Sequence, residues 1–247
     1  MTSSTLSLQL YTVREALGTD LRSALERVGS IGLRQVELFG FVERADEYAA
    51  LLREVGLTAP SAHVNLLDGQ AQAAFDAARR IGIGTVITPW TDPARWTSRA
   101  SVEAIADELS ALVEPAAAAG LRVGYHNHEF EFADLDGTSA YDVFTERLDP
   151  AVVLELDTYW AAVGGHDPAE LLGRLGERVQ FLHVKDGPAT RATKEQVPAG
   201  SGTLDVPGIL AAAPHALRVI EFDDYDGEIF DGILASIEFL TSKGESL

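Results

Sequence analysis

The stretch SVEAIADELSALVEPAAAAGLRVGYHNHEFEF, residues 101–132, contains the structural unit that repeats along the chain. Its first part places apolar residues at helical spacing up to Ala119, and Gly120 follows where a helix can end with positive φ. A short β-rich run from Arg122 to His126 comes next and leads into polar residues. The stretch therefore predicts a helix, a tight turn and a buried strand with a polar carboxyl end.

Pairs of a short apolar run and an amphipathic segment recur along the 247 residues, as is typical of βα units around a parallel sheet. The predicted strands are Leu6–Tyr11, Gln35–Phe39, Thr58–Val64, Thr85–Thr88, Arg122–His126, Val152–Leu156, Val179–Val184 and Arg218–Glu221. The predicted helices are Asp20–Ser30, Ala45–Val55, Gln70–Ile81, Ser101–Ala119, Tyr141–Arg147, Pro168–Leu175, Val206–Ala213 and Gly232–Leu240. Eight such pairs predict an α/β fold, the (β/α)8 TIM barrel, with a doubly wound open sheet as the alternative.

Composition fits one barrel domain over residues 1–247, because 46% of the residues are hydrophobic and 23% are charged. No internal repeat or linker interrupts the pattern. The segment Asp186–Asp205, which contains several Gly and Pro residues, predicts a long loop over the barrel mouth.

Charge and cysteine content exclude several classes of function. There are 19 Lys and Arg residues against 38 Asp and Glu residues, and the net charge of −19 disfavours a nucleic-acid partner. The absence of cysteine excludes disulfides, thiolate metal sites and a cysteine nucleophile. The amino-terminal residues do not resemble a signal peptide, and no apolar run approaches about 18 residues. A cytoplasmic protein without a membrane partner is expected.

Polar side chains that can bind a metal or move a proton stand at the ends of most predicted strands. In a barrel, these ends meet at one face. Four of the side chains come from consecutive strands, the fifth to the eighth, and two imidazoles with two carboxylates suit Mn²⁺, Co²⁺, Mg²⁺ or Zn²⁺. The sequence therefore predicts one divalent metal ion as cofactor. The four predicted ligands are His126, Asp157, His183 and Glu221.

Each strand-end residue also has a structural interpretation. Asp157 could only cap a helix, His63 could be a hydrogen-bonded buried group, and Glu37 could be a surface acid. Trp90 is interpreted as packing, and Trp160 either packs or forms an apolar wall for a sugar ring. The coincidence of metal-compatible groups at four strand ends favours the metal site.

The fifth strand leaves two sources for its ligand. Strand alternation puts His126 and His128 on one face, whereas a turn after His128 would bring Glu131 back to the mouth. Lys185 shares a strand face with His183, so its ammonium would lie beside the metal and stabilise an oxyanion.

Seven motifs keep one order along the chain: SLQLYTVR (7–14), VEL (36–38), YHNHEFEF (125–132), ELDTYW (155–160), HVKD (183–186), GSG (200–202) and IEFD (220–223). On these motifs the chain resembles the xylose isomerase-like TIM barrel superfamily, in its sugar phosphate isomerase/epimerase branch. The resemblance implies one divalent cation bound by Glu, Asp, His and Glu. Asp157, His183 and Glu221 match the last three, and His126 stands at the first position, with Glu131 as the other source of a carboxylate.

The resemblance also implies isomerase or epimerase chemistry on a keto-sugar, ketose or inosose through an enediolate. Glu131 and His128 are then predicted to transfer the proton, with Glu221 as both ligand and base. Lys185 would stabilise the oxyanion. The side chains predicted to shape the carbohydrate pocket are Glu37, His63 and Trp160.

Other functions compete with this prediction. The same enediolate can eject a β-hydroxyl group, so a lyase or dehydratase of the inosose or dehydroshikimate type is the main alternative. Endonuclease IV-like DNA repair is disfavoured by the negative charge and by the lack of further strand-end histidines. A non-catalytic binding protein is the third class. No Gly-rich phosphate motif follows the last two strands, which favours a non-phosphorylated sugar, and a homo-oligomer is consistent with the family.

Overall fold

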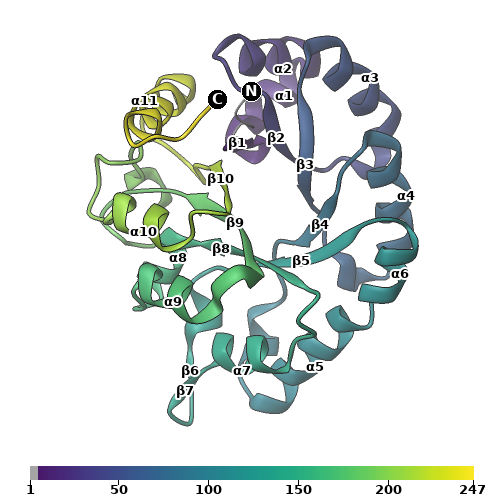
Figure 1. Ribbon diagram of the computed structural model, residues 1–247, viewed down its shortest axis with the longest axis vertical. Helices are drawn as coiled ribbons and strands as arrows, with labels where there is room; N and C mark the ends of the chain where they lie inside the picture. Colours follow the sequence, from purple (N-terminus) through teal and green to yellow (C-terminus); the bar gives the residue numbers. More distant parts are fainter. Residues whose placement is uncertain (1–4) are drawn as a thin grey trace.

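The computed structural model describes residues 5–247 and shows a closed parallel barrel inside a ring of helices (Figure 1). Within these residues, eight strands run around the barrel in the order β1-β10-β9-β8-β5-β4-β3-β2. They are β1 (Leu6–Gln9), β2 (Gln35–Phe39), β3 (Thr58–His63), β4 (Thr85–Thr88), β5 (Arg122–His126), β8 (Val153–Asp157), β9 (Val179–Val184) and β10 (Leu217–Ile220). Parallel pairing of β1 with β10 closes the ring. This closure confirms the predicted TIM barrel over the open sheet.

Helices cover the outside of the barrel (Figure 1). They are α1 (Arg14–Thr19), α2 (Leu21–Ser30), α3 (Ala45–Val55), α4 (Ala71–Ile81), α5 (Arg99–Ser110), α6 (Val113–Ala118), α7 (Ala140–Arg147), α8 (Thr158–Val163), α9 (Pro168–Leu175), α10 (Val206–Ala212) and α11 (Ile229–Ser242). In the described part of the chain, no helix is long and apolar enough to cross a bilayer.

The helix predicted over Ser101–Ala119 is two helices, α5 and α6, separated at Ala111 and Leu112. Pro115 accounts for the break. It has no N–H to donate to the Ala111 carbonyl, and its ring would collide with that carbonyl in a continuous helix. In the first turn of α6 this missing donor costs nothing. Gly120 adopts φ +74° after α6, as predicted.

The short helix α1, one antiparallel hairpin and the helix α8 were not predicted. Asp134–Leu135 and Thr138–Ser139 pair as the short antiparallel hairpin β6–β7, whose turn residues Asp136 and Gly137 both have positive φ. The helix α8 follows β8 directly because Asp157 ends the strand and caps the helix, accepting a 2.8 Å hydrogen bond from the Trp160 amide.

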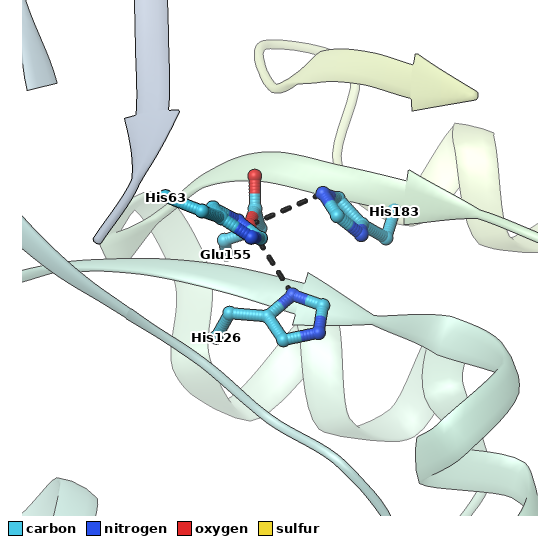
Figure 2. Close-up of side chains that lie close together, drawn as sticks. All are labelled: His63, His126, Glu155 and His183. Carbon is cyan, nitrogen blue, oxygen red and sulfur yellow. Dashed lines mark hydrogen bonds and ion pairs between the residues drawn. The ribbon is translucent and has the colours of Figure 1, made fainter. Parts of the chain in front are cut away.

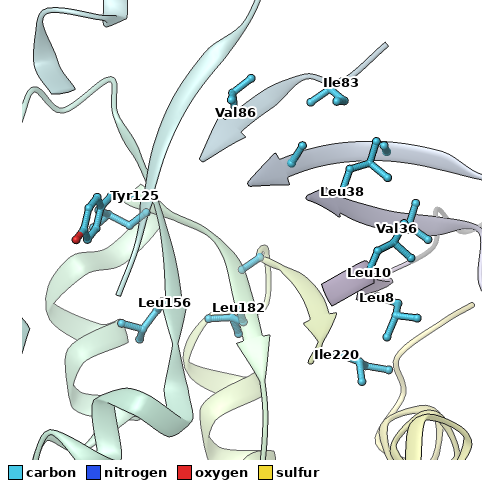
Figure 3. Close-up of a cluster of buried hydrophobic side chains, with 14 of the residues drawn as sticks. Leu8, Leu10, Val36, Leu38, Ile83, Val86, Tyr125, Leu156, Leu182 and Ile220 are labelled. Atoms are coloured by element: carbon cyan, nitrogen blue, oxygen red, sulfur yellow. The ribbon is translucent and has the colours of Figure 1, made fainter. Parts of the chain in front are cut away.

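Strand alternation divides the barrel residues between two environments. Outward side chains such as Val36, Leu156, Leu182 and Ile220 belong to the large core between strands and helices (Figure 3). A smaller apolar cluster contains Ile87, Val153, Phe181 and Val219. Because alternate residues share a face, β8, β9 and β10 have a polar residue at the next inward position towards their carboxyl ends, namely Glu155, His183 and, directly after β10, Glu221.

The predicted loop over residues 186–205 is held by one carboxylate. Asp186 is buried and accepts hydrogen bonds from four backbone amides of the loop. The short 3-10 turn Thr193–Glu195 interrupts the loop. These bonds replace regular secondary structure and fix the loop against the end of β9. The amides belong to Gly187, Gly200, Gly202 and Leu204.

Candidate metal centre and pocket

Two tiers of polar residues lie inside the barrel. On β8, Glu155 and Asp157 are two residues apart and share a face, so Asp157 lies nearer the carboxyl end of the strand. The residues of this interior are almost completely buried, including His126 and His183. Figure 2 shows Glu155 among the rings of His63, His126 and His183.

The four predicted ligands converge at the carboxyl ends of the strands. His126, Asp157, His183 and Glu221 each offer one ligand atom, and these atoms all lie within 4.8 Å of one another. Nδ1 of His183 is 2.6 Å from Oε2 of Glu221 and 3.9 Å from Oδ2 of Asp157, and Nε2 of His126 is 3.9 Å from the same Asp157 oxygen. This buried group could hold a metal ion.

Asp157 is both a helix cap and a candidate ligand. One carboxylate oxygen, Oδ1, caps α8, whereas Oδ2 faces the interior of the site. The Lys185 ammonium lies 2.7 Å from Oδ2 of Asp157 and 2.7 Å from Oε2 of Glu221. The two carboxylates therefore already contact a cationic group. The nitrogen and oxygen donors of His126, Asp157, His183 and Glu221 also suit a divalent cation.

The charges of these groups follow from burial and close contacts. Burial raises the pKa of Asp157 to about 6, although Lys185 opposes the shift. Burial would also raise the pKa of Glu221, but Lys185 and His183 outweigh it and hold that pKa well below its ordinary value. Burial and the neighbouring His183 lower the pKa of His126, so its ring is neutral and keeps a lone pair for a metal.

Glu37 and His63 lie at different depths. Glu37 is fully buried, and its carboxylate accepts hydrogen bonds from Gln9 at 2.7 Å and from Ser61 at 2.5 Å. His63 lines the pocket at the mouth, and its Nε2 lies 2.5 Å from Oε2 of Glu155. Burial opposes the charge on His63, but Glu37 and Glu155 outweigh it and raise its pKa to about 10.

Glu131 and His128 are close in the loop after β5 but face different surroundings. Glu131 lies in a 3-10 turn, fully buried, and accepts hydrogen bonds from the Tyr125 hydroxyl at 3.0 Å and the His128 amide at 2.9 Å. Burial raises the pKa of Glu131 to about 8. His128 lines the pocket, and burial lowers its pKa to about 4, so its imidazole is neutral near neutral pH. The turn therefore directs Glu131 into the loop and His128 into the pocket.

Trp160 is buried on α8 and forms a wall beside the cationic group. Its ring lies 5.7 Å from the Lys185 ammonium and 6.1 Å from the ring of His128. The indole thus contributes to the surroundings of Lys185, within range of a cation–π interaction.

A pocket of about 310 Å³ opens above the candidate metal centre. Its polar lining residues are His63, His126, His128, Glu221 and Asp223, and its apolar lining residues are Tyr11, Phe39, Pro89 and Trp90. Tyr11 and Trp90 are 41% and 45% exposed, which makes them two of the four exposed large hydrophobic residues in the described chain. The position of Trp90 differs from the packing role interpreted from the sequence.

Several residues of this site were not assigned a role from the sequence. Glu155 precedes the predicted ligand Asp157 by two residues on β8, so strand alternation is the signal that could have identified it, whereas Asp223 lies in the loop after β10. Asp223 contacts the Lys185 ammonium at 2.9 Å. Tyr11 and Trp90 each lie two residues beyond a strand, where loop geometry decides whether a side chain faces the mouth.

Comparison with known proteins decides the family. Residues 25–227 match the model of the xylose isomerase-like TIM barrel family. The chain belongs to this family. A sugar phosphate isomerase/epimerase from Parabacteroides distasonis has the same fold, with a TM-score of 0.85 and 24% identity over 98% of this chain and 95% of that one.

Two further similar proteins are described by a dehydratase activity and by a bound metal, respectively. An inosose dehydratase from Geobacillus kaustophilus is 34% identical over 85 residues, which cover 34% of this chain and only 27% of that protein. The IolI protein, solved with a bound zinc atom, matches this xylose isomerase-like chain with a TM-score of 0.71 and 14% identity, over 96% of this chain and 97% of that one. The neighbours of this chain thus include both isomerase/epimerase and dehydratase types.

Proposed function

We propose that the protein is a divalent-metal-dependent isomerase or epimerase of a keto-sugar, ketose or inosose, working through an enediolate. The observation that supports this most directly is the convergence of two imidazoles and two carboxylates at the floor of the pocket. His126, Asp157, His183 and Glu221 would hold the cation. When bound, the cation would supply Lewis-acid polarisation of a carbonyl and its neighbouring hydroxyl, which acidifies the C–H bond between them.

The chain's own residues would then move the proton and balance the charge. His128 is neutral and lines the pocket, so it can accept a proton from the substrate carbon and return it. Glu221 also lines the pocket and is the second candidate for this step. Lys185 would stabilise the developing oxyanion. Glu131, bonded to the His128 amide, is proposed to position His128.

The pocket also supports a carbohydrate substrate. Polar groups in its lining can hydrogen-bond to hydroxyl groups, and Tyr11, Phe39 and Trp90 can present aromatic surfaces to the C–H groups of a sugar.

Incubation of the metal-loaded protein with a panel of keto-sugars in D2O tests the proposal. We expect deuterium at the carbon next to the carbonyl, without loss of water, and loss of this exchange after chelation. Exchange that persists at the same rate in the chelated protein would contradict metal dependence.

A dehydratase is the second candidate, favoured by the 34% identity to inosose dehydratase over 85 residues. The same incubations separate the two reactions, because elimination of water produces an enone that absorbs in the ultraviolet. Enone formation that keeps pace with substrate loss would replace the isomerase assignment with the dehydratase one.

A further inference from the structure

Both candidate ligand histidines have a carboxylate at each end of the ring. Nδ1 of His183 faces Glu221 at 2.6 Å, while its Nε2 lies 2.8 Å from Oε1 of Glu37 and 3.2 Å from Oε2 of Glu155. For His126 the order is reversed: Nδ1 lies 3.2 Å from Oε2 of Glu155, and Nε2 faces Asp157. Each ring therefore spans from a carboxylate at the mouth to the carboxylates beneath, His183 reaching both Glu37 and Glu155 and His126 reaching Glu155.

The lower pair is defined here as the carboxylate floor, Glu37 and Glu155. These residues reach the barrel interior from β2 and β8, which are four places apart in the ring of eight strands and so lie on opposite sides. Both are completely buried. An ionised carboxylate only accepts hydrogen bonds, so each ring nitrogen that faces the floor must carry its proton towards it.

From this arrangement we propose that the carboxylate floor positions the metal ligands, by holding the proton of His126 on Nδ1 and the proton of His183 on Nε2. Nε2 of His126 and Nδ1 of His183, the two nitrogens that face Asp157 and Glu221, are then the nitrogens that a metal would bind. Without a metal, Nδ1 of His183 donates a hydrogen bond to Glu221 at 2.6 Å, and the metal would replace that proton. The inference rests on the proposed metal-dependent function and adds two positioning residues to it. A carboxylate that accepts the second N–H of a ligand histidine fixes the ring and raises its basicity.

A second metal ion is the competing explanation, because His63, His126, Glu155 and His183 also bring ligand atoms within 4.8 Å of one another. The two groups share His126 and His183. Filling both would require each of these rings to bind a metal through both nitrogens, with its last proton removed. Moreover, Nε2 of His63 is already engaged between the floor carboxylates, 2.5 Å from Glu155 and 3.1 Å from Glu37.

His63 completes the floor as its counter-charge. Its ring stacks on that of His183, with centroids 5.3 Å apart and planes inclined by 14° (Figure 2). Two buried carboxylates without a cation would be costly, since burial of an unpaired charge loses its hydration. The contacts of His63 with both carboxylates provide that cation inside the barrel.

Substitution of Glu155 tests the inference in the full-length chain. Glu155→Gln keeps an oxygen that can accept the histidine N–H, whereas Glu155→Leu removes it at similar volume. Thr85→Val is the matched control, because Thr85 is a buried residue on β4 whose hydroxyl has no hydrogen-bond partner in the described chain. Zn²⁺ affinity is measured by calorimetry for each variant.

We expect Glu155→Leu to weaken Zn²⁺ binding by about 10–100-fold, Glu155→Gln to weaken it less, and Thr85→Val to leave it unchanged. In addition, ¹⁵N shifts of the wild-type imidazoles with Zn²⁺ should show His183 bound through Nδ1 and His126 through Nε2. The shifts keep the inference testable if Glu155→Leu does not fold.

Several results would overturn the inference. If both Glu155 variants bind Zn²⁺ with wild-type affinity, the carboxylate floor does not position the ligands, although the metal site itself would stand. Binding of two Zn²⁺ per chain, or the opposite choice of nitrogens, would assign the lower group to a metal instead. A wild-type chain that binds no Zn²⁺, Mn²⁺, Co²⁺ or Mg²⁺ would overturn the proposed function together with the floor.

Discussion

The ammonium nitrogen of Lys185 lies 2.7 Å from Oδ2 of Asp157, an oxygen that also belongs to the candidate metal group. Lys185 is buried and contacts Glu221 and Asp223 as well. Burial opposes its charge, but the three carboxylates outweigh that effect and raise the pKa of Lys185 well above its ordinary value. The side chain is therefore a fixed positive charge next to the proposed metal, with consequences for both binding and catalysis.

Lys185→Met should separate these two effects. Loss of the ammonium leaves more negative charge around the cation, so we expect metal affinity to be unchanged or higher. Turnover should fall by about 100-fold or more, as when a donor to a developing oxyanion is removed. Calorimetry with Mn²⁺ measures the metal affinity. Turnover is measured as kcat on the substrate found in the D2O experiment. Lys243→Met, at an exposed position, is the control. If metal affinity and turnover fall together, Lys185 has only a structural role as an ion-pair partner.

Two substitutions of Asp157 separate its role as a helix cap from its role as a metal ligand. Asparagine is also a good helix cap, so Asp157→Asn should keep the bond to the Trp160 amide but lose the ionised ligand oxygen. Asp157→Ala should lose both. We expect both variants to bind metal at least about 100-fold more weakly, because a ligand is lost rather than an outer partner.

The two Asp157 variants should differ in stability. Loss of the cap costs about 1 kcal/mol, so the melting temperature of metal-free Asp157→Ala should be about 2–4 °C below that of Asp157→Asn. Thermal unfolding followed by circular dichroism measures the difference. Equal melting temperatures would mean that the cap contributes nothing, and wild-type metal affinity in Asp157→Asn would remove Asp157 from the ligand set.

Much of this fold could be predicted because its signals are local. Short apolar runs and the glycines after several of the helices indicate the barrel units, and the strand-end position brings His183 and Glu221 to one face without any knowledge of loops. Glu155 could have been predicted to face the barrel interior in the same way, since it shares a strand face with Asp157. Its mid-strand position, between Leu154 and Leu156, gave it the pattern of an ordinary strand residue.

The remaining differences depend on loop geometry, which sequence periodicity does not encode. Whether Glu131 faced the mouth depended on the turn after His128, and that turn points the carboxylate towards the Tyr125 hydroxyl instead. The exposure of Trp90 likewise depends on the path of the chain after β4. In contrast, the break between α5 and α6 had a visible signal in Pro115.

Trp90→Ala tests the aromatic residues that line the pocket. The indole is 45% exposed and lines the pocket, so it contributes little to the core and can contact substrate. Loss of a stacking contact of about 1 kcal/mol should raise KM roughly fivefold, with metal affinity and melting temperature close to those of the wild type. Leu234→Ala, which removes another exposed large hydrophobic residue on α11, is the control. An unchanged KM would exclude Trp90 from substrate binding.

Glu131→Gln should change how stability depends on pH. Burial raises the pKa of Glu131 from 4.5 to about 8, so the folded protein binds a proton there that the unfolded chain has released. The protonated carboxyl therefore stabilises the fold fully below pH 4.5, and this contribution is lost as the pH rises towards about 8. Glutamine does not titrate, so the free energy of unfolding of Glu131→Gln relative to wild type should rise across this interval. Urea unfolding of both metal-free proteins at several pH values measures it. Parallel curves would mean that Glu131 is ionised in the fold, held as a carboxylate by Tyr125 and the His128 amide.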